Sequence, residues 1–187
     1  MPGVFHPGFF FSSKFLLNYL LGFSLKDKTV LELGAGSGFI SIHAAATGAK
    51  VIATDISHKA IENIKINANE LAVTISTIHS DLFDRIPFQC FDFIVINPPY
   101  YKKRPNNEEE YTWYCGENGE YFIHLFSGIS SFVNQQSKVF MVLSEECDLD
   151  MIEKTAREHG WNMKEVKRKR IAWEKNFIYQ IQAYSPS

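Results

Sequence analysis

The chain has 187 residues, of which 45% are hydrophobic and 21% charged, with a formal net charge of −2. This length predicts one domain over residues 1–187, with residues 1–25 as an N-terminal arm and helix that cover the site. The charge balance argues against a general polyanion binder. Three scattered cysteines without a CxxC pair argue against a disulfide framework. They favour a cytoplasmic setting, and no apolar run reaches the ~18 residues of a membrane span.

The N-terminal region is rich in phenylalanine and predicts an irregular arm over residues 1–13. Ser12 or Ser13 is the expected N-cap of a helix that ends near Gly22. The aromatic side chains of the arm are expected to be buried, either over one edge of the core or along a pocket. They are Phe5, Phe9, Phe10 and Phe11.

Strand-like and helix-like segments alternate through the rest of the chain. Apolar and β-branched runs predict strands at 29–33, 50–55, 74–79, 93–96, 138–143, 163–169 and 177–184. Helical spacing of apolar residues predicts helices at 40–47, 57–71, 122–133 and 148–160. This alternation predicts an α/β fold whose mostly parallel sheet is covered by helices on both faces. The last two strands are expected to form a hairpin at the sheet edge.

A glycine-rich turn, Gly34-Ala35-Gly36-Ser37-Gly38, follows the first predicted strand directly. Glycine lets the backbone turn tightly and leaves room for a ligand to approach main-chain N–H groups. Asp55 ends the next strand 21 residues after Gly34, where nucleotide-binding α/β folds keep a ribose-binding carboxylate. Asp81 ends the third strand. These features together predict a nucleotide-like ligand.

The details of the turn argue against a dinucleotide. The pattern is GxGxG followed by Phe39, without the third glycine of GxGxxG. Glu32 lies two residues before the first glycine, where a carboxylate repels phosphate and attracts an ammonium group. No histidine spacing indicates a metal ligand set, so no metal is expected.

A second motif, Asn97-Pro98-Pro99-Tyr100, ends the strand at 93–96. Each proline lacks an N–H and fixes φ, which stops the strand and stiffens the turn. The turn holds an amide and an aromatic ring at the carboxyl end of a strand, where open α/β sheets bind their ligands. Alone, the motif also fits a plain proline turn.

Together, ELGAGSG, Asp55, Ser80-Asp81 and NPPY resemble the class I S-adenosylmethionine-dependent methyltransferases, over roughly residues 4 to 184. The resemblance implies a Rossmann-like, doubly wound, mostly parallel seven-stranded sheet with a reversed C-terminal strand. It implies S-adenosylmethionine as cofactor, with the glycines beside its methionine portion, Asp55 at the ribose, and Asp81 with Leu82 around the adenine. The expected cofactor-binding residues are Glu32, Gly34, Ala35, Gly36, Gly38, Asp55, Ile56, Asp81, Leu82 and Asn97.

The NPPY motif implies a planar nitrogen as methyl acceptor and predicts three catalytic residues. The Asn97 side-chain oxygen and the Pro98 carbonyl oxygen are expected to accept both N–H hydrogens of an NH₂ group. Tyr100 is expected to stack on its flat face. The donor methyl is already activated, so alignment and exclusion of water suffice.

Two acceptors remain open. Residues 113–119 resemble the stretch that follows NPPY in release-factor glutamine methyltransferases, and Arg170 with Glu174 resembles their late R-x-x-x-E stretch. A glutamine amide of a protein such as a translation release factor is therefore the first hypothesis. The short eukaryotic and archaeal-type forms of these enzymes carry an acidic pair in their N-terminal arm, whereas residues 8–14 of this chain contain no acidic residue.

The alternative is an exocyclic amine of adenine or guanine in RNA or DNA. Tyr101 suits stacking on a base, and basic runs lie at 102–104 and 164–170. We expect instead that residues 102–104 balance Glu108–Glu110 and that the second run is one exposed strand face. A non-catalytic donor-binding subunit is a third hypothesis, against which the intact motifs argue.

Overall fold

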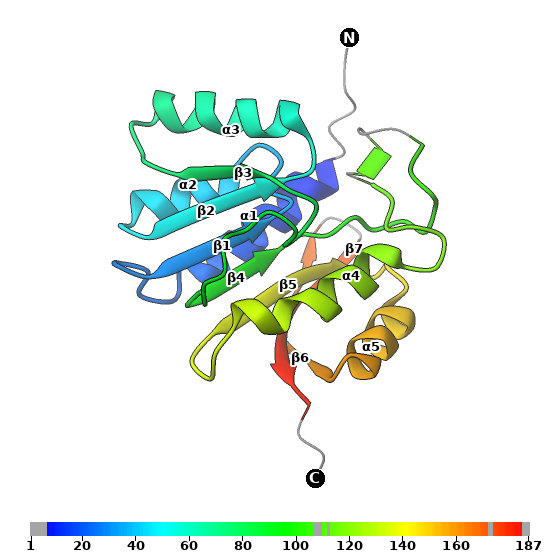
Figure 1. The fold of residues 1–187 in the computed structure, drawn as a ribbon. Coiled ribbons are helices and arrows are strands. Elements are labelled where there is room, and N and C mark those ends of the chain that lie inside the picture. Colours follow the sequence, from blue (N-terminus) through cyan, green and yellow to red (C-terminus); the bar gives the residue numbers. More distant parts are fainter. Residues whose placement is uncertain (1–6, 107–109, 112, 172–173, 185–187) are drawn as a thin grey trace.

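Helices and strands alternate along almost the whole chain, as the sequence predicts (Figure 1). The computed structural model describes residues 7–106, 110–111, 113–171 and 174–184. The helices are α1 (Pro7–Leu20), α2 (Phe39–Ala46), α3 (His58–Glu70), α4 (Glu120–Gly128), the 3₁₀ helix η2 (Ile129–Phe132) and α5 (Leu149–Glu158). The strands are β1 (Thr29–Leu33), β2 (Lys50–Asp55), β3 (Ser76–His79), β4 (Phe93–Ile96), β5 (Lys138–Ser144), β6 (Trp161–Ile171) and β7 (Glu174–Ala183).

The strands form one seven-stranded sheet in the order β3-β2-β1-β4-β5-β7-β6. Strands β1 to β5 are parallel, and β7 inserts antiparallel between β5 and β6. The predicted Rossmann-like sheet with a reversed C-terminal strand is confirmed, and the reversed strand is β7. The predicted edge hairpin is β6–β7.

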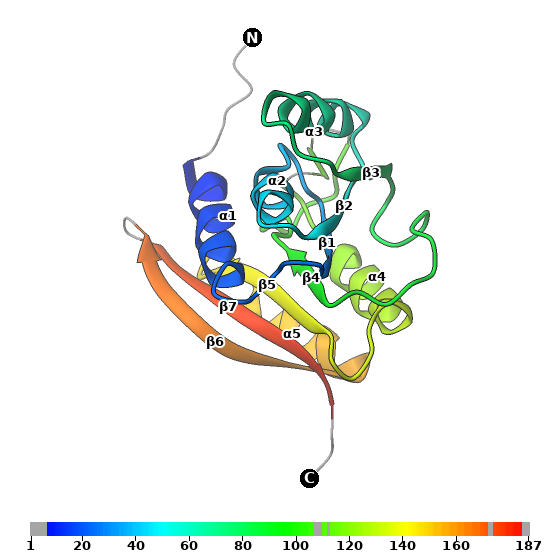
Figure 2. The same ribbon diagram turned by 90° about the vertical axis from the view of Figure 1, so that its left-hand side faces the viewer.

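Helices cover both faces of the sheet, because successive side chains of each buried strand point to opposite sides. In β4, Phe93 and Val95 pack in one cluster with α1 and α2, while Ile94 and Ile96 pack in another with α4 and α5. Helix α3 lies on the same side as α1 and α2 (Figure 2).

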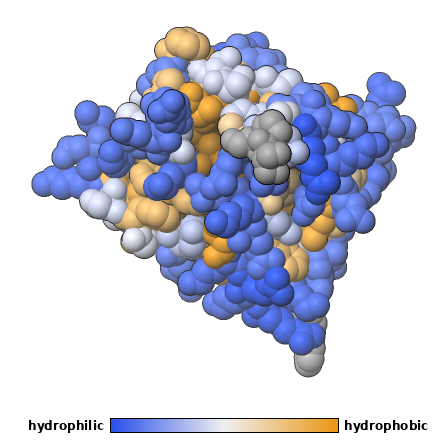
Figure 3. Space-filling model, turned by 90° about the horizontal axis from the view of Figure 1, so that it is seen from below, coloured by the Kyte–Doolittle hydropathy of each residue, from blue (hydrophilic) through white to orange (hydrophobic). Residues whose placement is uncertain are grey.

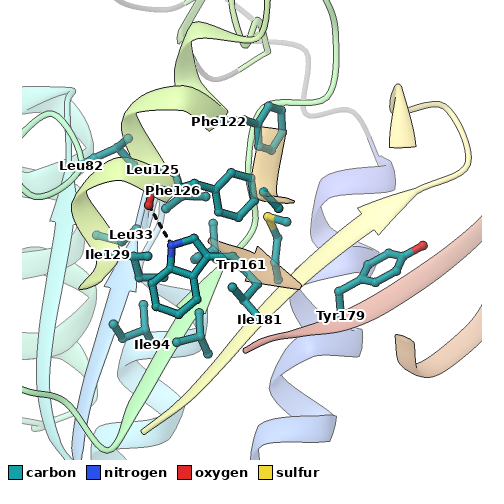
Figure 4. Close-up of a cluster of buried hydrophobic side chains, with 14 of the residues drawn as sticks. Leu33, Leu82, Ile94, Phe122, Leu125, Phe126, Ile129, Trp161, Tyr179 and Ile181 are labelled. Atoms are coloured by element: carbon teal, nitrogen blue, oxygen red, sulfur yellow. Dashed lines mark hydrogen bonds between the residues drawn. The ribbon is translucent and has the colours of Figure 1, made fainter. Parts of the chain in front are cut away.

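The cluster that contains Ile94 and Ile96 also contains a buried tryptophan, and the indole N–H of this tryptophan has a hydrogen-bond acceptor. Trp161, at the start of β6, donates its indole N–H to the main-chain oxygen of Phe126 in α4 at 2.9 Å (Figure 4). This bond joins the sheet edge to α4.

The N-terminal prediction is wrong in two respects. Helix α1 already begins at Pro7, so Ser12 and Ser13 lie inside the helix and do not cap it. Proline suits the first turn of a helix, since its missing N–H has no intrahelical partner there. Phe11 is 44% exposed and is not a buried residue. Phe5 lies outside the described residues, as do the side chains of Phe9 and Phe10.

Other boundaries differ modestly from the prediction. The helix expected at 122–133 divides into α4 and η2, and β6 and β7 are longer than the predicted strands. None of the helices in the described ranges is long and apolar enough to cross a membrane. Seen from below, most of the surface is hydrophilic, with smaller hydrophobic areas between (Figure 3).

Candidate active site

The predicted site residues meet at one edge of the sheet, where four parallel strands end. Leu33, the last residue of β1, faces Thr54 of β2 on one side and Ile96 of β4 on the other. The glycine turn, Asp55 and Asn97 follow directly after these neighbours. The carboxyl edge of an open α/β sheet is where such folds bind ligands.

The glycine turn is held in place by Asp55. One carboxylate oxygen, Oδ2, accepts the Gly36 N–H at 2.8 Å, and Oδ1 accepts the Ser57 N–H at 2.8 Å. Gly34, Gly36 and Gly38 all have positive φ, between 55° and 76°. A Cβ at Gly38 would also come within 3.0 Å of Ile64 in α3, so this turn requires glycine.

Glu32 lies beneath this turn and is 4% exposed. Its Oε2 accepts the main-chain N–H of Ser41 at 2.8 Å and also the Ser41 hydroxyl. Burial raises the pKa of Glu32 to about 7, which the bonds from Ser41 oppose and the nearby Asp55 carboxylate reinforces. An attraction between Glu32 and a ligand ammonium stays a prediction.

The segment after β3 places Asp81 and Leu82 beside α4. Ser80 is buried, and its hydroxyl donates to the Leu82 carbonyl and accepts the Arg85 N–H, both at 3.0 Å. Leu82 has φ +43°, which is unusual for a non-glycine residue. The side chain of Asp81 is half exposed.

Helix α4 contributes two residues that the sequence did not single out. His124 lies between two carboxylates, with Nδ1 3.9 Å from Asp81 Oδ1 and Nε2 3.0 Å from Asp84 Oδ1. Burial raises the pKa of Tyr121, and the Asp81 and Asp55 carboxylates raise it further. The i, i+3 spacing of these two residues puts them on one helix face, but no sequence signal links that face to Asp81.

Asn97 is bonded to α1 and to Tyr100. Its Nδ2 donates to Ser12 Oγ at 3.1 Å and to Ser13 Oγ at 3.0 Å, and the Tyr100 hydroxyl donates to Asn97 Oδ1 at 3.1 Å. Ser12 is fully buried and Tyr100 is 6% exposed. Ser12 Oγ also lies 3.4 Å from Asn97 Oδ1, so α1 and Tyr100 together hold the Asn97 amide at both of its terminal atoms. Burial raises the pKa of Tyr100 above its ordinary value, so Tyr100 is a neutral hydrogen-bond donor.

The sequence predicts Ser12 or Ser13 as a helix cap and does not predict either as a site residue. One signal does point to the site, since Ser12 lies four residues before the buried Leu16 and so shares the apolar stripe of α1. A hydroxyl on such a stripe needs a partner.

The segment after NPPY is tied to the loop after β5. The Tyr101 hydroxyl donates to Glu146 at 2.8 Å, and Lys102 forms a 2.7 Å ion pair with Asp148. Lys103 lies over the Tyr114 ring, 4.6 Å from its centre. The expected balance of residues 102–104 against Glu108–Glu110 is therefore wrong for Lys102, whose partner is Asp148. Glu108 and Glu109 lie outside the described residues.

The second basic run behaves as expected. Lys164 and residues 167–170 are all exposed on β6, at the open edge of the sheet. Among the residues that the structure describes, no group of three or more histidine, cysteine or acidic side chains is arranged to hold a metal ion.

Comparison with known proteins gives consistent matches. Residues 1–114 match the family described as methyltransferase small domain. A Rickettsia conorii bifunctional methyltransferase is 53% identical over 79 residues, covering 40% of this chain and 15% of that protein. A Methanocaldococcus jannaschii protein, provisionally named a protein N5-glutamine methyltransferase, is 41% identical over 110 residues. The match covers 58% of this chain and 52% of that protein. The chain thus spans about half or less of the length of these two relatives.

Solved structures match the whole fold at lower identity. The Encephalitozoon cuniculi (E. cuniculi) Mtq2–Trm112 complex, described as responsible for methylation of the termination factor eRF1, matches with a TM-score of 0.70 and 20% identity. That match covers 99% of this chain and 98% of the other. The Thermus thermophilus (T. thermophilus) 16S rRNA N2 G1207 methyltransferase, solved with AdoMet and guanosine, matches with a TM-score of 0.65 and 18% identity. That match covers 90% of this chain and 42% of the other. At these identities the likeness concerns the fold.

Proposed function

Because the chain belongs to the methyltransferase small-domain family, whose methyl donor is S-adenosylmethionine, we propose that it methylates a glutamine side-chain amide of a protein. A translation release factor is the proposed acceptor, and the cytoplasm the proposed compartment. The observation that supports this proposal is the position of Asn97, which follows Ile96 at the same sheet edge as the glycine turn that follows Leu33.

The residues present fit the proposed donor. Cβ positions at Gly34 and Gly36 would meet no atom within 4 Å, so a ligand has open backbone to approach. Asp55 would bind the ribose hydroxyls, and Asp81 and Leu82 would flank the adenine. S-adenosylmethionine supplies a methyl group already activated on a sulfonium.

The acceptor residues have the task of orienting a poor nucleophile. An amide nitrogen has a delocalised lone pair, and two acceptors on its N–H hydrogens would draw electron density onto it. Asn97 Oδ1 and the Pro98 carbonyl oxygen would be those acceptors. The serines would fix the orientation of the Asn97 amide through Nδ2, while Oδ1 also accepts from the Tyr100 hydroxyl and lies 3.4 Å from Ser12 Oγ. The ring of Tyr100 is proposed to contact the flat acceptor group.

The surroundings of NPPY favour a protein amide over a nucleic-acid base. The Tyr101 hydroxyl donates to the Glu146 carboxylate, and Lys102 is paired with Asp148. Both carboxylates lie beside the segment after NPPY, where they would repel the phosphates that a nucleic-acid site binds. The name of the M. jannaschii relative agrees with this choice.

One experiment tests the donor, the acceptor class and the catalytic assignment together. Purified protein is incubated with methyl-labelled S-adenosylmethionine and either translation release factors or bulk RNA. We expect label in protein, at a glutamine, and no label with Asn97→Ala, which should retain most donor affinity in calorimetry. Label in RNA alone would refute the glutamine acceptor, and turnover by Asn97→Ala would refute the role of Asn97.

A second candidate is methylation of a base in RNA. It is favoured by the exposed basic residues of β6 and by the fold likeness to the T. thermophilus rRNA enzyme. A third, a non-catalytic donor-binding subunit, predicts donor binding in calorimetry without label in either pool.

A further inference from the structure

We propose that the end of the β6–β7 hairpin is a docking surface for an acidic region of the protein acceptor, an inference that rests on the proposed protein substrate. The surface consists of residues 167–170 of β6 with Lys175 of β7. None of these residues is among the donor-binding or catalytic residues described above.

The strand registers place this surface beside the acceptor site. Ile96, the residue before Asn97, pairs with Met141 of β5. Met141 in turn pairs with Tyr179 of β7, and Tyr179 pairs with Glu165 of β6. Residues 167–170 therefore begin at the level where β4 ends and continue beyond it. Neighbouring strands are ~4.8 Å apart, so β6 lies roughly 15 Å to the side of β4.

Two further observations agree with this placement. The Glu174 carboxylate, at the start of β7, is one of the groups that raise the pKa of Tyr100 and Tyr101. In Figure 2 the paired ends of β6 and β7 extend past β5 and lie beside α1, the helix that bonds Asn97. A protein bound with its glutamine at Asn97 would thus meet the hairpin end.

The charge of this segment contrasts with that of the chain. Residues 164–175 contain six basic and two acidic residues, whereas the whole chain has a net charge of −2. Arg168 is paired with Glu165 at 2.6 Å and Lys175 with Glu145 at 3.5 Å. Lys167 and Lys169 are exposed and have no ion pair within the described ranges.

Protection of the free β6 edge against pairing with other chains explains only part of the distribution of basic residues along β6. Lysines on an edge strand discourage pairing with other chains, and so does a β-bulge, which β6 has between Glu165 and Lys167. That purpose would be served anywhere along the strand. Four consecutive basic residues instead follow the bulge, at the end beside NPPY, while Trp161 to Met163 at the other end carry no charge.

An acidic protein surface fits better than RNA. Nucleic-acid surfaces usually combine cations with exposed aromatic rings on which bases stack. Here Phe177, the nearest ring of β7, lies under Arg168 at 5.8 Å and is not among the exposed large hydrophobic residues. Among the described residues of β6 and β7, no exposed aromatic ring lies at this end of the hairpin. A short cationic strip of this kind suits carboxylates on a partner, where its charge would speed encounter and set orientation.

The test compares Lys167→Glu/Lys169→Glu with Lys26→Glu/Lys50→Glu, which makes the same charge change at two exposed lysines near the amino end of β2, away from the carboxyl edge of the sheet where the site lies. The substrates are an intact release factor and a short synthetic peptide containing its acceptor glutamine. For the hairpin variant we expect KM for the intact factor to rise on the order of tenfold, with a weaker dependence of KM on salt. Its kcat, its donor affinity and its activity on the peptide should stay unchanged, as should all values for the control.

Two outcomes overturn the inference. An unchanged KM for the intact factor refutes docking while leaving the glutamine activity in place. Label found only in RNA refutes both this inference and the proposed function. If the charge reversal prevents folding, Lys167→Ala/Lys169→Ala provides the same comparison with a smaller expected rise in KM.

Discussion

Ser12 and Asn97 lie within hydrogen-bond distance, with Asn97 Nδ2 donating to Ser12 Oγ at 3.1 Å. An asparagine amide can rotate by half a turn and exchange its oxygen and nitrogen. Two hydroxyl acceptors on consecutive residues of α1 favour the orientation in which Nδ2 faces the helix. The oxygen proposed to bind the acceptor is therefore oriented by a helix outside the NPPY motif.

Replacing both hydroxyls should lower turnover without removing the donor site. For Ser12→Ala/Ser13→Ala we expect kcat to fall on the order of tenfold or more, because the orientation of Asn97 loses two hydrogen bonds. Donor affinity by calorimetry should change less than about threefold, and Ser12→Thr/Ser13→Thr should restore much of kcat. Ser127→Ala, which removes an exposed hydroxyl of α4 that bonds only its own helix, is the control. Equal kcat in the double alanine variant and the parent would contradict this role.

Asp55→Asn should weaken donor binding. The Asp55 carboxylate accepts N–H bonds from Gly36 and Ser57, and an amide cannot accept both with its two terminal atoms. Hydrogen bonds to a charged group contribute about 1.5–3 kcal/mol each, so we expect a loss of affinity of ten- to a hundredfold by calorimetry. Asp150→Asn, an exposed acid in the first turn of α5, should leave affinity unchanged. Unaltered affinity in Asp55→Asn would show that neither the turn nor the donor depends on this carboxylate.

Stability should fall with rising pH because of Glu32. Burial raises the pKa of Glu32 from 4.5 to about 7, so between these values the folded chain keeps a proton that the unfolded chain releases. The contribution of the raised Glu32 pKa to the free energy of unfolding is therefore fully present below pH 4.5, and it is lost as the pH rises through 7. The shift corresponds to on the order of 3 kcal/mol.

The measurement is urea unfolding of the parent and of Glu32→Gln at pH 5 and pH 8. The free energy of unfolding of the parent should decrease relative to Glu32→Gln over this interval, since glutamine does not titrate. A difference between the two proteins that is the same at both pH values would mean that Glu32 does not keep its proton in the folded state.

Trp161→Phe should destabilise the fold and leave donor binding intact. The substitution removes the indole N–H that bonds the Phe126 carbonyl and leaves that buried oxygen without its donor. A loss of about 1–3 kcal/mol in the free energy of unfolding is expected from urea titration. Tyr184→Phe, at an exposed position, should lose less than about 0.5 kcal/mol. A neutral Trp161→Phe would mean that packing of the ring, and not the bond, holds the edge strand to α4.

Local features of the fold could be read from the sequence. The bounds of β1, β2 and β4 agree with the prediction, because each is a short apolar run that ends at a glycine, an acid or an asparagine before a turn. The Ser57 cap of α3 is likewise present, with its hydroxyl accepting the Ala60 N–H. Such signals depend on neighbouring residues only, so one sequence suffices to find them.

Contacts between distant residues could not be read in this way. Nothing in the order of residues links Ser12 to Asn97, His124 to Asp81 or Lys102 to Asp148, since each pair meets only through packing of whole elements. Sequence alone predicts a local role for the two serines, as a helix cap, because local hydrogen bonding is the usual use of serine near a helix start. The fold thus followed from local patterns, whereas much of the surroundings of the site did not.

The two halves of the site also differ in how far apart their parts lie along the chain. Gly36 and Asp55, which build the donor half, are 19 residues apart, whereas Ser12 and Asn97 are separated by 85. Closing the longer loop costs more chain entropy, so the short-range half has the easier route to assembly during folding. A chain in which α1 has not yet docked would hold the donor but lack an oriented Asn97. Methyl transfer would then begin only after the first helix and the middle of the sheet have come together.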